Sequence, residues 1–64
     1  MKEFKISIAA ARVNANLTQA QAAEKIGVTP RTVCSWENGL TSPKVKQLDK
    51  IAEVYEIPKD ILDI

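Results

Sequence analysis

Two polar side chains near the middle of the 64-residue chain have the chemistry and spacing to read the edges of DNA bases. Arg31 carries a planar guanidinium fork that matches O6 and N7 of guanine, and Ser35 follows one helical turn later with a small hydroxyl. Val33 and Trp36 are spaced to share the buried face of a helix. The polar side chains around them must therefore mostly point outward: Arg31, Thr32, Cys34 and Ser35. The alternative is that all four are ordinary surface residues of a helix.

A second group of residues could hold a phosphate backbone without reading bases. Thr18-Gln19 and Thr29-Pro30 each begin a predicted helix, and helix N-termini offer N–H groups and partial positive charge to an anion. Beyond the second helix, five residues could flank a groove and fix the register on the backbone: Asn38, Gly39, Thr41, Lys44 and Lys46. The alternative for the two lysines is that they only solubilise the next helix.

The formal net charge of +1 hides an uneven distribution. Residues 1–50 hold eight Lys or Arg against four acids, a net +4, whereas residues 51–64 hold one Lys against four acids, a net −3. Phosphate binding depends on the local density of basic groups and not on the total. We therefore expect the C-terminal segment to face away from a bound anion.

Length and composition exclude several classes of protein. The chain is one small domain, residues 1–64, with no nucleophile–base pair, so we do not expect an enzyme. It has one cysteine and no histidine, which excludes an internal disulfide and a Cys/His metal set, and we expect no metal, cofactor or small-molecule ligand. No apolar run approaches the roughly 20 residues of a membrane span. The N-terminus lacks a signal-peptide core, and we expect a cytoplasmic protein. Redox control through Cys34 is a weaker alternative, because exposed thiols are usually inert unless their pKa is lowered.

The helices expected to position these residues begin and end at recognisable caps. A first helix runs from about Ser7 until Asn16, and its apolar face is Ile6, Ala9, Ala10 and Val13. A second runs over residues 19–26, opened by a capping box between Thr18 and Gln21 and closed by Gly27. A third runs over residues 30–37, opened by Thr29 and Pro30 and closed by Gly39.

The last quarter of the chain predicts one long helix and a short turn. Ser42-Pro43 repeats the cap-then-proline device, and the helix extends to about Tyr55, with an apolar face of Val45, Leu48, Ile51, Ala52 and Tyr55. Pro58 opens a final turn. Residues 1–6 show no clear period, and no segment predicts a strand. The expected fold class is all-α, with five helices joined by short loops.

Residues 19–38 form two short helices around a glycine turn, which is the helix-turn-helix signature. The stretch LTQAQAAEKIGVTPRTVCSWENG resembles the helix-turn-helix of the Cro and lambda-repressor family, also called Xre, and the likeness extends over about residues 6–63. This resemblance implies a five-helix domain that binds double-stranded operator DNA as a homodimer, with its third helix in the major groove. It also implies a transcriptional regulator, most simply a repressor.

The resemblance assigns roles to individual positions. Gln19 matches a phosphate contact, and Asn38 matches a backbone contact beyond the third helix. Pro30, Arg31 and Ser35 match base-facing positions, with Thr32 and Cys34 beside them. Arg12 and Glu37 match a pair that bridges the first helix to the end of the third. Two positions depart from the family: Pro30 replaces an amide side chain and cannot make its base contact, and Glu56 stands where many relatives have glycine.

The apolar C-terminal residues suggest a contact between two copies of the chain. Ile57, Ile61, Leu62 and Ile64 are more apolar side chains than one short turn can bury, which predicts a homodimer interface. The alternative is that they cap the core of the single chain. A second hypothesis for function remains open: a protein-interaction module, such as an antitoxin or an anti-regulator, that docks through this apolar segment.

Overall fold

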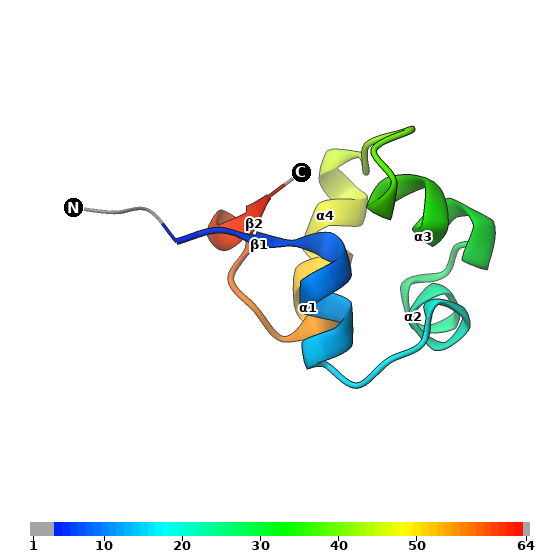
Figure 1. Cartoon of the computed structure of the whole chain (residues 1–64), viewed down its shortest axis with the longest axis horizontal. Helices are drawn as coiled ribbons and strands as arrows, with labels where there is room; N and C mark the ends of the chain where they lie inside the picture. Colours follow the sequence, from blue (N-terminus) through cyan, green and yellow to red (C-terminus); the bar gives the residue numbers. More distant parts are fainter. Residues whose placement is uncertain (1–3, 64) are drawn as a thin grey trace.

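The computed structural model describes residues 4–63, and two minimal strands, one before and one after the helices in the sequence, lie side by side at one end of the molecule (Figure 1). Strand β1 spans Ile6–Ser7 and is followed by helix α1, Ile8–Asn14. Helices α2, Gln19–Ile26, and α3, Pro30–Glu37, come next, and α4 spans Val45–Tyr55. A single turn of 3₁₀ helix, η1, covers Lys59–Ile61 and leads into strand β2, Leu62–Asp63. None of the helices in this described part is long and apolar enough to cross a membrane.

Helices α2 and α3 have the bounds and caps that the sequence predicts. The Thr18 hydroxyl accepts the Gln21 N–H at 3.1 Å, and the Gln21 side chain accepts the Thr18 N–H at 2.9 Å, so the capping box is confirmed. The Thr29 hydroxyl accepts the Thr32 N–H at 3.2 Å, with Pro30 as the first helical residue. Gly27 has a φ of 94°, the left-handed conformation that only glycine adopts without strain.

Helix α4 begins later than the Ser42-Pro43 pair predicts. Lys44 is the N-cap residue, and its N–H donates to the Gln47 side chain at 2.8 Å, which fixes the helix start at Val45. Pro43 lies before the helix and is buried. The later start turns Val45 outward, where it is 77% exposed, so its prediction as a core residue was wrong.

Helix α1 buries a different face from the one predicted. Ser7 caps it and Asn16 ends it with a φ of 62°, the left-handed conformation expected there. The buried residues are Ile8 and Ala11, whereas Val13 is 58% exposed. The prediction failed because it counted the helical period from Ile6, which lies in the preceding strand and cannot share a helix face.

A two-stranded parallel sheet joins the ends of the described chain, which corrects one expectation. Ile6 pairs with Leu62 and Ser7 with Asp63. The prediction of no strand was therefore wrong. The all-α prediction fits, but five helices are not confirmed: residues 4–63 contain four α-helices, and the predicted turn after Pro58 is a single 3₁₀ turn. Strands of two residues are too short to show an alternating pattern in the sequence. Their pairing also joins residues at opposite ends of the chain, which no local pattern predicts.

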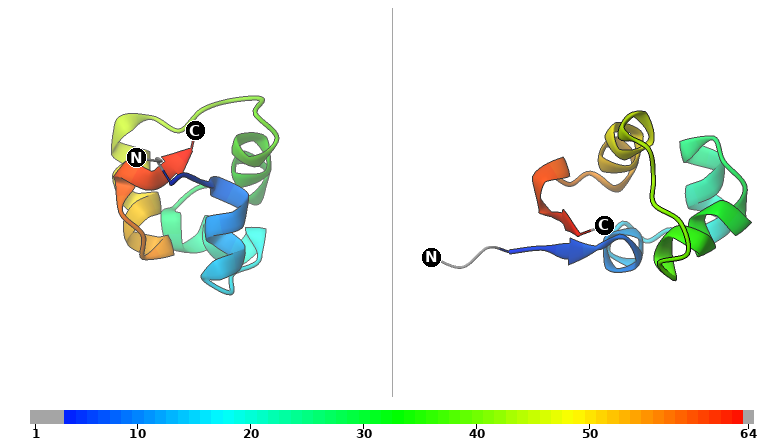
Figure 2. Two further views of the ribbon diagram at one scale, coloured as in Figure 1. Left: turned by 60° about the vertical axis from the view of Figure 1, so that its left-hand side comes forward. Right: turned by 90° about the horizontal axis from the view of Figure 1, so that it is seen from above.

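All four helices and β2 contribute to one apolar core. Views from two further directions show α1, α2 and α4 around it, with α3 closing the side next to α2 (Figure 2). Its buried residues are Ile8, Ala11, Ala22, Ala23, Ile26, Val33, Trp36, Ile51, Tyr55 and Leu62. Val33 and Trp36 therefore point inward, as predicted, and fix which face of α3 is outward.

Candidate nucleic-acid interface

The outward face of α3 carries two side chains with free hydrogen-bonding capacity. Arg31 is exposed and Ser35 is half-buried. Neither side chain forms a hydrogen bond or ion pair with any other residue in the part of the chain that the structure describes. A guanidinium with no internal partner can use its whole fork on an external acceptor.

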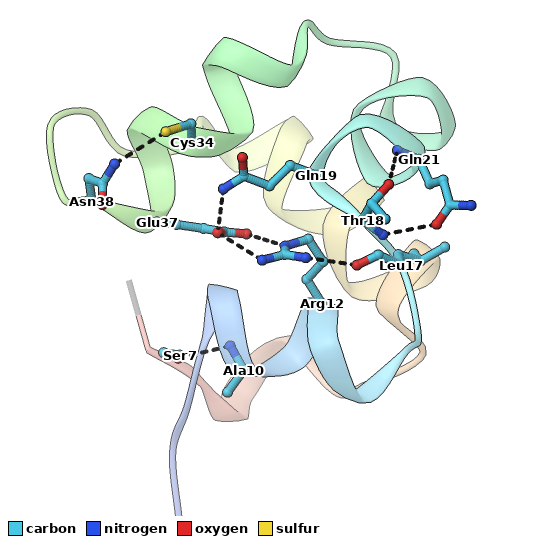
Figure 3. A network of polar contacts seen from close by, with 10 residues as sticks. All are labelled: Ser7, Ala10, Arg12, Leu17, Thr18, Gln19, Gln21, Cys34, Glu37 and Asn38. Carbon is cyan, nitrogen blue, oxygen red and sulfur yellow. Dashed lines mark hydrogen bonds and ion pairs between the residues drawn. The ribbon is translucent and has the colours of Figure 1, made fainter.

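The other side chains of this face are partly engaged. The Thr29 and Thr32 hydroxyls lie 2.9 Å apart, and one donates a hydrogen bond to the other. Cys34 Sγ accepts a hydrogen bond from the Asn38 side-chain amide at 3.2 Å (Figure 3). Pro30 is exposed but has no polar group to offer. We infer that any base readout depends first on Arg31 and Ser35, with Thr32, Cys34 and Pro30 shaping the surface beside them.

The two cap threonines are less available to a phosphate than the sequence suggests. Each hydroxyl oxygen already accepts a backbone N–H of its own helix, Gln21 in α2 and Thr32 in α3. Among residues 4–63, the N–H groups at these two helix starts that have no hydrogen-bond partner are those of Gln19, Ala20, Thr29 and Arg31. The sequence predicted both helix starts correctly, but the polar groups left without an internal partner there are mainly backbone N–H groups.

A partly buried ion pair joins α1 to α3, and its arginine also contacts the segment just before α2. Arg12 Nε lies 2.6 Å from Glu37 Oε2, and the two side chains are only 15% and 7% exposed. Arg12 Nη1 also donates to the Leu17 carbonyl at 2.8 Å. The hydrogen bond from Arg12 to Glu37 raises the pKa of the arginine, while burial opposes that shift. The pairing of Arg12 with Glu37 is confirmed.

Gln19 joins this ion pair, which the sequence did not predict. Its Nε2 donates to Glu37 Oε1 at 2.9 Å, so one carboxylate contacts side chains from α1 and α2 (Figure 3). The two residues are 18 positions apart, on different helices, and no local spacing rule connects them.

The segment after α3 forms an exposed edge beside the reading face. Asn38, Gly39, Thr41, Lys44 and Lys46 are all exposed. Gly39 has a φ of 75°, which lets the chain turn away from the helix. Neither lysine side chain forms an ion pair within residues 4–63. Leu40, 75% exposed in the same loop, is an apolar surface residue that the sequence analysis did not single out.

The C-terminal apolar residues do not all lie on the surface. Leu62 is 5% exposed and belongs to the core, so its side chain is not available for an interface between copies. Ile57 and Ile61 are half-buried, and Ile57 packs against the core. Ile64 lies outside the described residues. For Leu62, the interpretation that it caps the core of the single chain is the correct one.

Residues 4–63 contain no group of three or more His, Cys, Asp or Glu side chains that could hold a metal ion. The arrangement is instead one of two adjacent helices, an outward Arg31 and a basic edge. In a comparison with protein families, the family described as "Helix-turn-helix" matches residues 8–62, from the start of α1 to β2. The chain belongs to this helix-turn-helix family. The resemblance to Cro and lambda-type repressors is thereby confirmed.

A curated relative extends this helix-turn-helix assignment. The chain is 36% identical over 55 residues to the cryptic phage CTXphi transcriptional repressor RstR of Vibrio cholerae. The alignment covers 86% of this chain and 50% of the relative, so the chain spans about half the length of that protein. No solved structure matches the chain.

Proposed function

We propose that this helix-turn-helix chain is a transcriptional repressor that binds operator DNA and acts by occupying it. The observation that carries the proposal is the outward face of α3, where the side chains of Arg31 and Ser35 have no partner among residues 4–63. The buried side chains of Val33 and Trp36 hold this face outward on a fixed helix. The relative named as a transcriptional repressor supports the same class of function.

In this proposal α3 lies in the major groove, as helix-turn-helix recognition helices do. Arg31 donates to a guanine and Ser35 to a neighbouring base, and Thr32, Cys34 and Pro30 line the same contact. The phosphate backbone is held by a second set of residues: Thr18, Gln19, Thr29, Asn38, Gly39, Thr41, Lys44 and Lys46. These contacts set the register without reading the sequence.

The operator of this proposal has two half-sites, each bound by one copy of the chain. Ile57 and Ile61 are the described apolar side chains that we assign to the contact between copies, with Ile64 as a further candidate. The partners of the chain are therefore double-stranded DNA and a second copy of itself.

A selection from random double-stranded DNA tests the proposal directly. The bound pool should converge on one sequence, and binding to it should weaken steeply as salt rises, because counterions are released from contacted phosphates. Lys46→Ala should reduce the slope of log K against log salt by about one, with the same loss on all sequences. Failure to enrich any sequence, with a folded protein, would favour the protein-interaction module instead.

A further inference from the structure

Glu37 is the most heavily used acceptor among the side chains of the described chain. Its Oε2 accepts Arg12 Nε at 2.6 Å, and its Oε1 accepts both Arg12 Nη2 at 3.2 Å and Gln19 Nε2 at 2.9 Å. The carboxylate lies at the end of α3, whereas its partners come from α1 and from the first residue of α2. Three helices are therefore joined by one side chain that is 7% exposed (Figure 3).

The bond from Gln19 leaves part of that amide free. A glutamine NH₂ group has two hydrogens, and Glu37 takes one of them. Gln19 is only half-buried and stands where α2 begins, beside the open backbone N–H groups of that helix end. Held in this way, the second hydrogen of Nε2 has a fixed direction instead of sampling the rotamers of a free glutamine.

The ion pair with Arg12 makes an acid tolerable at this place. A bare carboxylate this close to the open end of α2 would repel an approaching phosphate. Arg12 compensates the charge of Glu37 through two hydrogen bonds, and it also fixes the Leu17 carbonyl, one residue before the cap of α2. Glu37 therefore accepts the hydrogen bond from Gln19 while Arg12 balances its negative charge.

We propose that Glu37 is a positioning residue for DNA binding: it holds the Gln19 amide so that its remaining N–H meets a phosphate next to the N-terminus of α2. The inference rests on the proposed function and adds a role for an acid whose side chain is only 7% exposed. A fixed donor binds more tightly because its rotamer freedom is lost before binding.

A double-mutant cycle on operator affinity tests this role. Gln19→Ala should lower affinity about fivefold to tenfold on specific and random DNA alike, because a phosphate contact carries no sequence information. Glu37→Gln places an amide nitrogen against the donors of Arg12 and should lower affinity by a similar factor. In the Gln19→Ala background, the same change at Glu37 should alter affinity less than about twofold, since coupled residues are not additive.

An effect of charge alone would change the affinity for DNA in the opposite direction, so the experiment distinguishes the two explanations. Removing an acid should raise the affinity for DNA, and Glu24→Gln, an exposed acid on α2, is the matched control for that effect. A gain in affinity for Glu37→Gln equal to that of Glu24→Gln, or an equal loss with and without Gln19, would overturn the proposal. Unfolding curves of each variant separate loss of fold from loss of binding.

A measurement on the unaltered chain covers the case in which Glu37→Gln does not fold. Side-chain ¹⁵N relaxation should show the Gln19 NH₂ group as rigid as the backbone, while the NH₂ group of Asn14, which is exposed and forms no side-chain hydrogen bond within residues 4–63, is mobile. Operator DNA should then shift the Gln19 side-chain signals. A Gln19 amide as mobile as that of Asn14 would overturn the positioning role, whereas a folded chain that binds no operator would overturn the proposed function.

Discussion

In the proposed complex with DNA, Arg31 is the side chain on which sequence readout should depend most. Arg31→Ala should weaken binding to the selected operator by roughly 1–3 kcal/mol, because the bidentate contact to one guanine is lost. Binding to random DNA should fall much less. Titration of both duplexes at one salt concentration measures the difference, and Arg31→Lys is the control that keeps the charge but not the fork. Equal losses on both duplexes would make Arg31 a phosphate contact.

Tyr55 has a buried hydroxyl with no hydrogen-bond partner within the described residues. Burial, followed by the charge of Glu37, raises the pKa of Tyr55 to about 12 from 10.0, and Arg12 opposes the shift. The unfolded chain therefore loses this proton first, so stability is retained below pH 10 and falls as the pH rises toward 12.

Tyr55→Phe should remove this alkaline loss of stability. At pH 7 the variant should be more stable by about 1 kcal/mol, since an unsatisfied buried hydroxyl is replaced by hydrogen. Urea unfolding of both proteins at pH 7 and at pH 11 measures the two effects. A variant that is clearly less stable at pH 7 would show that the hydroxyl has a partner in solution, such as a bound water.

At the scale of elements, Glu56 ends α4 in the left-handed conformation, with φ 57° and ψ 45°. This conformation costs a residue with a side chain roughly 1–2 kcal/mol, whereas its cost for glycine is small. Glu56→Gly should therefore stabilise the chain by about 0.5–1 kcal/mol after the greater freedom of glycine in the unfolded state is counted. The departure from the family's glycine thus leaves the turn in place and adds strain to it.

Chemical denaturation against a matched glycine tests this account. Glu53→Gly, three residues earlier inside α4 and also exposed, should cost about 1 kcal/mol through lost helix propensity. Opposite signs at the two positions are the expected result. Destabilisation by Glu56→Gly would mean that the strain is smaller than the entropy of the added glycine.

Features that depend on neighbouring residues were predictable from the sequence, whereas features that depend on distant residues were not. The caps at Thr18 and Thr29 involve residues three positions apart, and both helices begin where these residues predict. The start of α4 was missed because Gln47, and not Ser42, supplies the cap bond. The strand pair and the bond from Gln19 to Glu37 were missed because their partners lie far apart in the sequence. For the candidate site, the bounds of α3 and its outward face were predictable, but the use of the cap hydroxyls as internal acceptors was not.

At the scale of the whole molecule, two kinds of surface lie at opposite ends of the long axis. Strands β1 and β2 lie with η1 at one end, and α2 and α3 lie at the other (Figures 1 and 2). The molecule measures 37 Å along this axis, against 23 and 19 Å across it. The apolar side chains Phe4, 69% exposed, and Ile61, half-buried, belong to the end with the strands. A contact between copies at this end leaves both reading helices free.

Ile61 is the position at which this contact can be tested without unfolding the chain. Leu62 is unsuitable because a charge there would enter the core, but Ile61 lies in η1 and is partly open to solvent. Ile61→Glu should raise the dissociation constant of the homodimer at least tenfold, because a carboxylate would be placed in an apolar interface. Sedimentation of the unaltered chain and the variant, from low to high micromolar concentration, measures this change.

Measurements of DNA affinity should give an independent test of the contact between two copies of the chain. Two copies on half-sites one helical turn apart place their reading helices about 34–36 Å from each other, so a palindrome with that spacing should bind far better than a single half-site. Ile61→Glu should remove this advantage and leave the affinity for the single half-site unchanged, because the residue is remote from α3. Palindromes with other spacings serve as the control, since only a rigid dimer distinguishes among them. An unaltered chain that stays monomeric at high micromolar concentration, and binds half-sites as tightly as every palindrome, would show that each copy acts alone.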